Sequence, residues 1–61
     1  MSNTKENILQ TALKLFATQG YDATSVRQIA KEANANLSAI SYHFESKEGL
    51  YKAVFCIALT L

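Results

Sequence analysis

The chain contains no proline, no tryptophan, only two glycines and a single cysteine among its 61 residues. Because proline and glycine disfavour helix interiors, their scarcity favours an all-α chain. One cysteine excludes an internal disulfide, and the lack of clustered Cys and His residues predicts no metal site. A chain this short buries only about 60% of its unfolded surface, so it forms one small domain at most.

Charge of one sign is also scarce, because six Lys and Arg residues stand against five Asp and Glu residues, for a net charge of +1. This is a weak signal for a nucleic-acid-binding domain, whose pI commonly exceeds about 9. The longest apolar run, residues 53–59, is far shorter than the roughly 20 residues of a membrane-spanning helix. The N-terminus lacks the apolar core of a signal peptide. We therefore expect a cytoplasmic protein without membrane contact.

Hydrophobic periodicity is the feature that the chain has in abundance, and it predicts four helices. The first begins near Asn3 or Thr4, either of which can cap a helix, and ends at Gly20, which tolerates the left-handed conformation. Its predicted apolar face consists of Ile8, Leu9, Ala12, Leu13, Phe16 and Ala17.

A second helix is predicted from Ser25, which can cap it while Gln28 returns a bond to the Ser25 amide. Asn34 ends this helix, because Asn is tolerated at positive φ and allows a sharp turn. The predicted inward face of the second helix is Val26, Ile29, Ala30 and Ala33.

A third helix is expected from about Leu37 to His43, with Asn36 as a cap. Ile40 and Phe44 lie four residues apart and can anchor its inner face. Two helices joined by such a tight turn form the unit that places the second helix in the DNA major groove. The spacing also fits an ordinary three-helix bundle without a DNA function, so both interpretations stay open on spacing alone.

A fourth helix is predicted from about residue 47, capped by Ser46. Tyr51 and Phe55 are expected on its core-facing side. Residues 53–59 are apolar all the way round, as in a helix that is buried on every side. We therefore expect residues 1–61 to be the N-terminal part of a longer protein, truncated inside this helix; the alternative is an oligomeric interface.

The segments ILQTALKLFATQGYDATSVRQIAKEAN and AISYHFESKEGLYKAV resemble the N-terminal DNA-binding domain of the TetR family of bacterial transcriptional repressors. The resemblance runs from about Thr4 to Val54. It implies a three-helix, homeodomain-like helix-turn-helix bundle plus the start of a fourth helix, with the helix-turn-helix motif at about residues 25–44. Two departures stand out: the family usually has Gly-Val at Asn34-Ala35, and often Tyr at Ser41, where it commonly contacts a phosphate.

The resemblance also implies partners. We expect double-stranded operator DNA, a homodimer of the full-length protein, and a small-molecule effector in a C-terminal ligand-binding and dimerisation domain that is absent from these 61 residues. No cofactor is implied. The function expected is sequence-specific DNA binding by a ligand-responsive repressor.

Base contacts are expected from the N-terminal turn of the third helix, which meets base edges in this docking geometry. Ser38 can bond to either base type, while Leu37 and Ala39 offer apolar contact to a thymine methyl group. Arg27, in the first turn of the second helix, either reads a guanine or contacts a phosphate; the sequence leaves both open.

Phosphate contacts are expected at two helix starts, where amides and hydroxyls favour anions. Thr24 and Ser25 precede the second helix, and Lys47 lies in the first turn of the fourth, where the resemblance makes it a phosphate-binding residue. Further candidates are Tyr42 and His43, unless one of these rings packs on the first helix, and Ser41, whose contact is either lost or passed to Tyr42.

Two other functions compete with DNA binding. The first is a helical interaction module that uses the apolar face of the fourth helix to bind a protein. The second is an enzyme, which has little support because no nucleophile–base pair and no metal constellation is present, so no catalytic residue is predicted. Cys56 is expected to act as a small hydrophobic residue.

Overall fold

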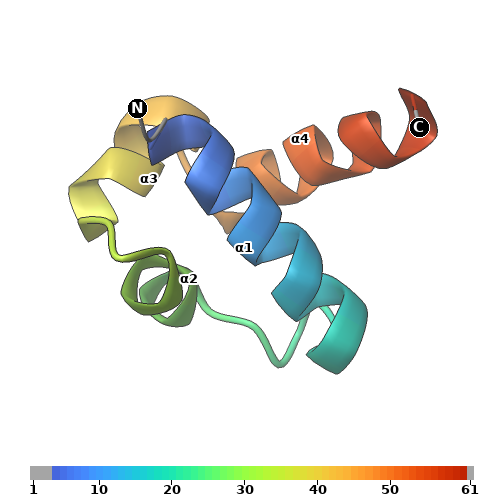
Figure 1. Ribbon diagram of the computed structural model, residues 1–61, viewed down its shortest axis with the longest axis horizontal. Helices are drawn as coiled ribbons and strands as arrows, with labels where there is room; N and C mark the ends of the chain where they lie inside the picture. Colours follow the sequence, from blue (N-terminus) through green and yellow to red (C-terminus); the bar gives the residue numbers. More distant parts are fainter. Residues whose placement is uncertain (1–3, 61) are drawn as a thin grey trace.

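The computed structural model describes residues 4–60, apart from the side chains of residues 58 and 60. These residues form four helices without a strand: α1 (Thr4–Gln19), α2 (Val26–Ala33), α3 (Leu37–Phe44) and α4 (Lys47–Thr60). Figure 1 shows α1 running across the molecule, with the short helices α2 and α3 on one side and α4 extending away on the other. The predicted all-α helix-turn-helix bundle with a fourth helix is confirmed, while Asn3 lies outside the described residues.

The inward face of α1 is centred on Ile8, Ala12 and Leu15, all buried. Leu9, Leu13 and Phe16, which were predicted on this face, are partly buried against the same core. The prediction for Ala17 is wrong, because Ala17 is exposed. At about 100° per residue, a position nine residues after Ile8 lies on the opposite side of the helix.

One hydrophobic core joins all four helices. The α2 face was predicted correctly, with Val26 partly buried at its edge, and Ile40 and Phe44 anchor α3 as expected. Burial of these side chains is the main source of stability in so small a domain. The core members beyond α1 are Ile29, Ala30, Ala33, Ile40, Phe44, Leu50 and Val54.

The turn between α2 and α3 depends on Asn34, whose φ of 55° and ψ of 45° confirm the predicted left-handed conformation. The Asn34 amide donates to the Lys31 carbonyl at 3.2 Å, and the Ala35 amide donates to the Ala30 carbonyl at 2.9 Å. These two bonds form a Schellman motif, which satisfies carbonyls that the end of the helix would otherwise leave unpaired. The turn therefore sets the direction in which α3 departs.

Because the left-handed conformation disfavours side chains that lack a local hydrogen-bonding group, Asn34→Ala is expected to lower the free energy of unfolding by about 1 kcal/mol. Asn34→Gly is expected to leave it unchanged or raise it. Urea denaturation followed by circular dichroism measures both. At the exposed Gln10 inside α1, alanine must instead be more stable than glycine. The same order at both sites would contradict the turn assignment.

The starts of the later helices were predicted only in part. The Ser25 hydroxyl accepts a hydrogen bond from the Gln28 amide at 3.1 Å, and the Ser46 hydroxyl accepts one from the Gly49 amide at 3.2 Å, so both caps are confirmed. The return bond expected from the Ser25 amide to the Gln28 side chain stays a prediction, and the Gln28 side-chain oxygen accepts from Gln19 Nε2 at 2.7 Å. Asn36 occupies the cap position of α3 without a capping bond from its side chain.

The connection from α3 to α4 is a single tight turn at Glu45. Glu45 has a φ of 72° and a ψ of −44°, and the Ser46 amide donates to the Phe44 carbonyl at 2.8 Å. A bond between residues two apart around such dihedrals is a γ-turn, a strained conformation in proteins. It reverses the chain within one residue, so the end of α3 and the first turn of α4 lie against each other.

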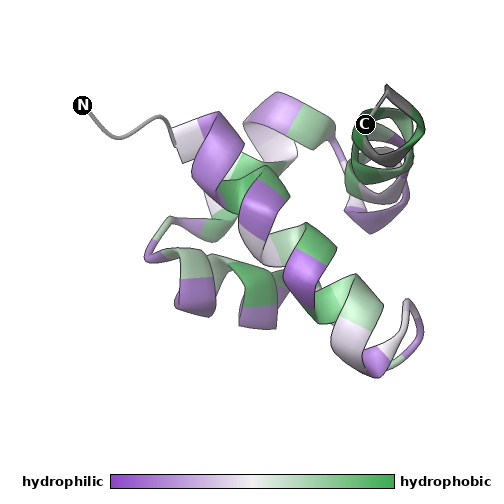
Figure 2. Ribbon diagram, turned by 45° about the vertical axis from the view of Figure 1, so that its right-hand side comes forward, coloured by the Kyte–Doolittle hydropathy of each residue, from purple (hydrophilic) through white to green (hydrophobic). Residues whose placement is uncertain are grey.

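The distal half of α4 is the most exposed apolar part of the structure. Leu50 and Val54 are buried, but Phe55 is 55% exposed and Leu59 is 71% exposed. The prediction that Tyr51 and Phe55 lie on the core-facing side is therefore wrong within the described residues, since Tyr51 is also 40% exposed. Helix α4 projects past the helices that bury its first two turns (Figure 1), although much of it is coloured hydrophobic in Figure 2. None of the four helices over residues 4–60 combines the length and apolar character needed to cross a membrane.

Candidate nucleic-acid interface

Helix α3 turns one face inward and offers the other to solvent. Ile40 and Phe44 lie in the core, whereas Tyr42, on the opposite side of the helix, is 83% exposed. Because two anchors four residues apart fix the rotation of a helix, they also fix the direction in which its outward residues point. The other exposed members are Leu37, Ser38, Ser41 and His43, with Ala39 half-buried.

Helix α2 is held beneath α3 by a contact that the sequence did not predict. The Asn7 side chain of α1 donates from Nδ2 to the Ala33 carbonyl at 2.6 Å. This bond satisfies a carbonyl of the last turn of α2, immediately before Asn34. It therefore ties α1 to the end of the helix from which α3 departs. The two residues are 26 positions apart, so no local spacing signals the pair.

The start of α2 has one buried and two exposed candidate residues. Ser25 and Arg27 are both exposed, with Arg27 in the first turn. Thr24 is only 1% exposed, and its hydroxyl lies 2.7 Å from the Gly20 carbonyl oxygen and 3.4 Å from that of Leu15. A hydroxyl that is buried and donates to a backbone carbonyl is not available to a phosphate. In this structure the Thr24 side chain joins the turn before α2 to the end of α1.

Lys47, in the first turn of α4, is partly buried. Its ammonium nitrogen lies 4.1 Å from the centroid of the Tyr21 ring, within the range of a cation–π contact. Tyr21 belongs to the turn between α1 and α2, so the contact joins this turn to the first turn of α4. Tyr21 was not among the predicted site residues, because its wide separation in sequence from Lys47 leaves no periodic signal.

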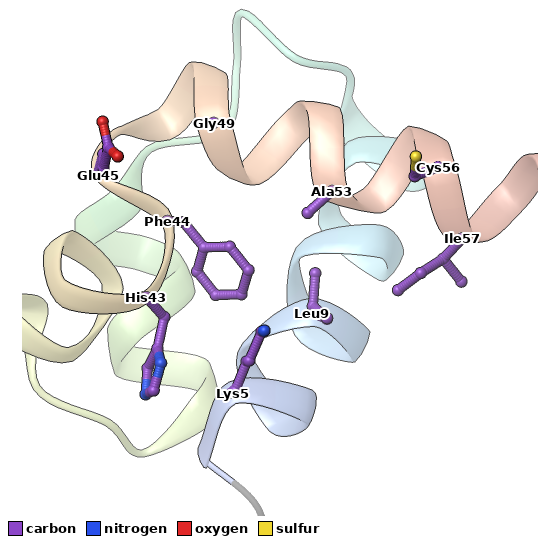
Figure 3. A pocket seen from close by; sticks show the side chains of 9 residues that line it. All are labelled: Lys5, Leu9, His43, Phe44, Glu45, Gly49, Ala53, Cys56 and Ile57. Carbon is purple, nitrogen blue, oxygen red and sulfur yellow. The ribbon is translucent and has the colours of Figure 1, made fainter.

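Tyr42 and His43 form an exposed ring pair at the end of α3, with centroids 5.0 Å apart and planes at 77°. His43 also borders a hollow of about 410 Å³ between α1, α3 and α4. Figure 3 shows Leu9 and Phe44 pointing into this hollow and His43 beside Lys5 at its edge. Tyr42, being 83% exposed, does not pack on α1.

Few titratable side chains surround the hollow between α1, α3 and α4. Over residues 4–60, no group of three or more His, Cys, Asp or Glu side chains is placed to hold a metal ion. The lining of the hollow includes the Lys5 ammonium, the His43 imidazole and the Glu45 carboxylate, among apolar side chains. Cys56, expected to be a small hydrophobic residue, is exposed beside it.

A helix that is anchored from one side, exposed on the other and joined to its support by a left-handed turn defines a helix-turn-helix domain. The family described as "Bacterial regulatory proteins, tetR family" matches residues 8–54. This match spans more than half of the sequence, and the chain belongs to the TetR family of bacterial regulatory proteins.

Similar proteins are described as transcriptional regulators. The "Probable HTH-type transcriptional regulator YttP" of Bacillus subtilis is 48% identical over 48 residues, which are 79% of this chain and 23% of that protein. IcaR of Staphylococcus aureus, a negative transcriptional regulator of the biofilm operon icaADBC, is 40% identical over 48 residues, covering 79% and 26% of the two chains.

A solved structure shares the fold. The crystal structure of HlyIIR, a hemolysin II transcriptional regulator, superimposes with a TM-score of 0.81 at 52% sequence identity. The match covers 85% of this chain and 29% of that one. The chain thus spans about a quarter of the length of the relatives that it matches.

Proposed function

We propose that this chain is the DNA-binding domain of a bacterial transcriptional repressor and binds double-stranded operator DNA in a sequence-specific manner. The observation that carries the proposal is the fixed rotation of α3, which buries Ile40 and Phe44 and leaves Tyr42 and its neighbours open to solvent. Such a helix fits the major groove, with its N-terminal turn toward the bases.

Base contacts are assigned to the first turn of α3. Ser38 is exposed and supplies a hydroxyl that can donate or accept, and Leu37, 41% exposed, supplies apolar surface. Ala39 is half-buried and lies at the edge of this surface. Arg27, at the start of α2, is assigned to a guanine or to a neighbouring phosphate.

Phosphate contacts are assigned to the two helix starts, with Ser25 and Lys47, and to the second half of α3, with Ser41, Tyr42 and His43. With a net charge of only +1, affinity must come from where the positive groups lie rather than from their number. Helix N-termini add partial positive charge to the amides at Ser25 and Ser46. Thr24 supports this surface from inside and is not assigned a direct contact.

A salt titration tests the proposal against a protein-interaction module. Duplexes enriched by the chain from a randomised pool are titrated at several salt concentrations, with mixed-sequence duplex as the non-specific reference. DNA binding requires log K to fall linearly with log salt, because bound cations are released. Failure to enrich any duplex, even at low salt, would sink the proposal.

Lys47→Ala is expected to weaken binding to specific and mixed-sequence duplexes by similar factors and to reduce the salt slope by about 1, as loss of one phosphate contact predicts. Lys52→Ala is the matched control, because it removes the same charge from an exposed position farther along α4. A slope that changes equally in both variants would show a general charge effect instead of a phosphate contact at Lys47.

The regulator as a whole is proposed to be larger than this domain. Relatives are about four times as long as the part that matches, which supports residues 1–61 as a helix-turn-helix domain followed by a ligand-binding and dimerisation domain. We infer a homodimer whose two domains bind one operator and whose spacing changes when a small-molecule effector binds. Since bacterial operators lie in the cytoplasm, the regulator is placed there.

A further inference from the structure

We propose that Tyr21 is a positioning residue, which holds the Lys47 ammonium over its ring and so prepares it to bind a DNA phosphate. The inference rests on the proposed function, because it concerns the phosphate contact of Lys47. Its structural basis is the distance of 4.1 Å between the Lys47 nitrogen and the Tyr21 ring centroid.

The Tyr21 ring is itself held from two sides. Its centroid lies 4.9 Å from that of Tyr51, with the planes at 70°, and 5.6 Å from that of Phe16. Phe16 and Tyr51 also meet edge to face at 5.4 Å. Three rings from α1, the following turn and α4 thus form one aromatic cluster, with two edge-to-face pairs and one tilted pair, and edge-to-face contact is a geometry that such rings favour. A ring packed in this way offers the ammonium a fixed partner.

The place of the contact relates it to DNA. Lys47 follows Ser46, whose hydroxyl caps α4, and the Tyr21 carbonyl accepts a bond from the Thr24 amide at 3.2 Å, directly before Ser25. The contact therefore joins the two helix starts that are proposed to face phosphates. A lysine that was free at this position would have a large rotamer entropy to lose on binding.

Preorganisation is the expected gain. Immobilising a flexible side chain at an interface reduces affinity by about two- to tenfold, and a residue already held in place avoids that loss. The ring face binds one side of the ammonium, whose three N–H donors leave others for a phosphate oxygen. Tyr21 thus contributes to affinity without contacting DNA.

The test varies the ring and leaves Lys47 unchanged. Tyr21→Phe keeps an electron-rich ring face, and Tyr21→Leu removes it. A ring-fluorinated phenylalanine at position 21 keeps the shape of the ring but reduces the negative potential of its face. Phe55→Leu is the matched control, because it removes an exposed ring of α4 that is not one of the three rings of this cluster. The readouts are the ring-current shift of the Lys47 Cε protons in the free chain and duplex affinity.

We expect Tyr21→Phe to retain both the upfield Lys47 shift and the affinity. Tyr21→Leu and the fluorinated variant are expected to lower affinity by about two- to tenfold, and this loss must disappear in a Lys47→Ala background. The fluorinated variant keeps the test valid if leucine prevents folding. Equal affinity losses for Tyr21→Leu and Phe55→Leu, or higher affinity without the Tyr21 ring, would overturn the inference.

The same experiment separates this inference from the proposed function. If the Lys47 protons show the upfield shift but the chain binds no duplex, DNA binding itself is contradicted, and the role of Tyr21 is removed with it. Normal DNA binding together with an unshifted Lys47 signal contradicts only the positioning role.

Discussion

Replacing Gly49 by alanine is expected to lower the free energy of unfolding by about 3 kcal/mol, near the upper end of what overpacking costs in proteins. A β-carbon at this position would overlap the Phe44 carbonyl oxygen and approach its carbonyl carbon to 3.3 Å. Both are backbone atoms, and Phe44 is anchored in the core with 7% exposure. Neither helix can yield locally, so α4 must move away from α3.

The sign of the effect makes Gly49→Ala informative. In an ordinary helix, replacing glycine by alanine stabilises by about 1 kcal/mol, so a large loss can come only from the contact between the helices. Displacement of α4 also moves Lys47 relative to α3, and we therefore expect weaker duplex binding even under conditions where the variant stays folded.

Gly20→Ala is the control for this prediction. Gly20 has a φ of +89°, and a β-carbon added there would have no atom within 4 Å, so alanine meets backbone strain of about 1–2 kcal/mol without a clash. Urea denaturation of the two variants, followed by circular dichroism, compares the free energy of unfolding lost to backbone strain at Gly20 with that lost to atomic overlap at Gly49. A Gly49→Ala chain as stable as the parent would contradict the close packing of α3 against α4.

Ser38→Glu is expected to weaken duplex binding by roughly a hundredfold, equivalent to about 3 kcal/mol, because it brings a negative charge against DNA phosphates. Ser38 is exposed in the first turn of α3. An acidic side chain is favourable in the first turn of a helix, because it faces the positive end of the helix dipole. The substitution is thus expected to leave folding intact, and lost binding cannot be attributed to unfolding.

Gln10→Glu makes the same change of charge on the exposed side of α1 and serves as the control. Thermal melts verify that both variants fold, and duplex titrations at two salt concentrations measure their affinity. If α3 enters the major groove, only Ser38→Glu shows the large loss. Equal losses in the two variants would indicate a long-range charge effect, and no loss in either would place the interface elsewhere.

The helices and turns follow from local rules. The errors concern which side of a helix is covered by its neighbours. Asn34 was predicted at the turn because few other residues tolerate its φ of 55°, and Ser25 and Ser46 were predicted as caps. Ala17, Tyr51 and Phe55 were misplaced, because periodicity shows which residues are apolar but not which side of a helix its neighbours cover.

In the candidate site, some features could be predicted from the sequence and others could not. Its exposed residues on α3 follow from the two anchors Ile40 and Phe44, once the helix and its inner face are known. The burial of Thr24 was not foreseen, because a hydroxyl next to a helix start fits both a phosphate contact and an internal bond to Gly20. The two roles are distinguished only by the tertiary structure, in which the chain turns back past the end of α1 and brings the Thr24 hydroxyl to the Gly20 carbonyl.

By itself, the sequence determined the four helices, the left-handed turn at Asn34 and the anchored, outward-facing helix α3, because caps, turns and helical spacing act between residues a few positions apart. Only the tertiary structure decided three features: the need for glycine at position 49, the bond from Asn7 to Ala33 and the ring beneath Lys47. The last two join residues far apart in the chain, and the first depends on how closely α4 packs against α3. Such contacts leave no periodic trace in the sequence, since the packing of the helices alone brings their atoms together.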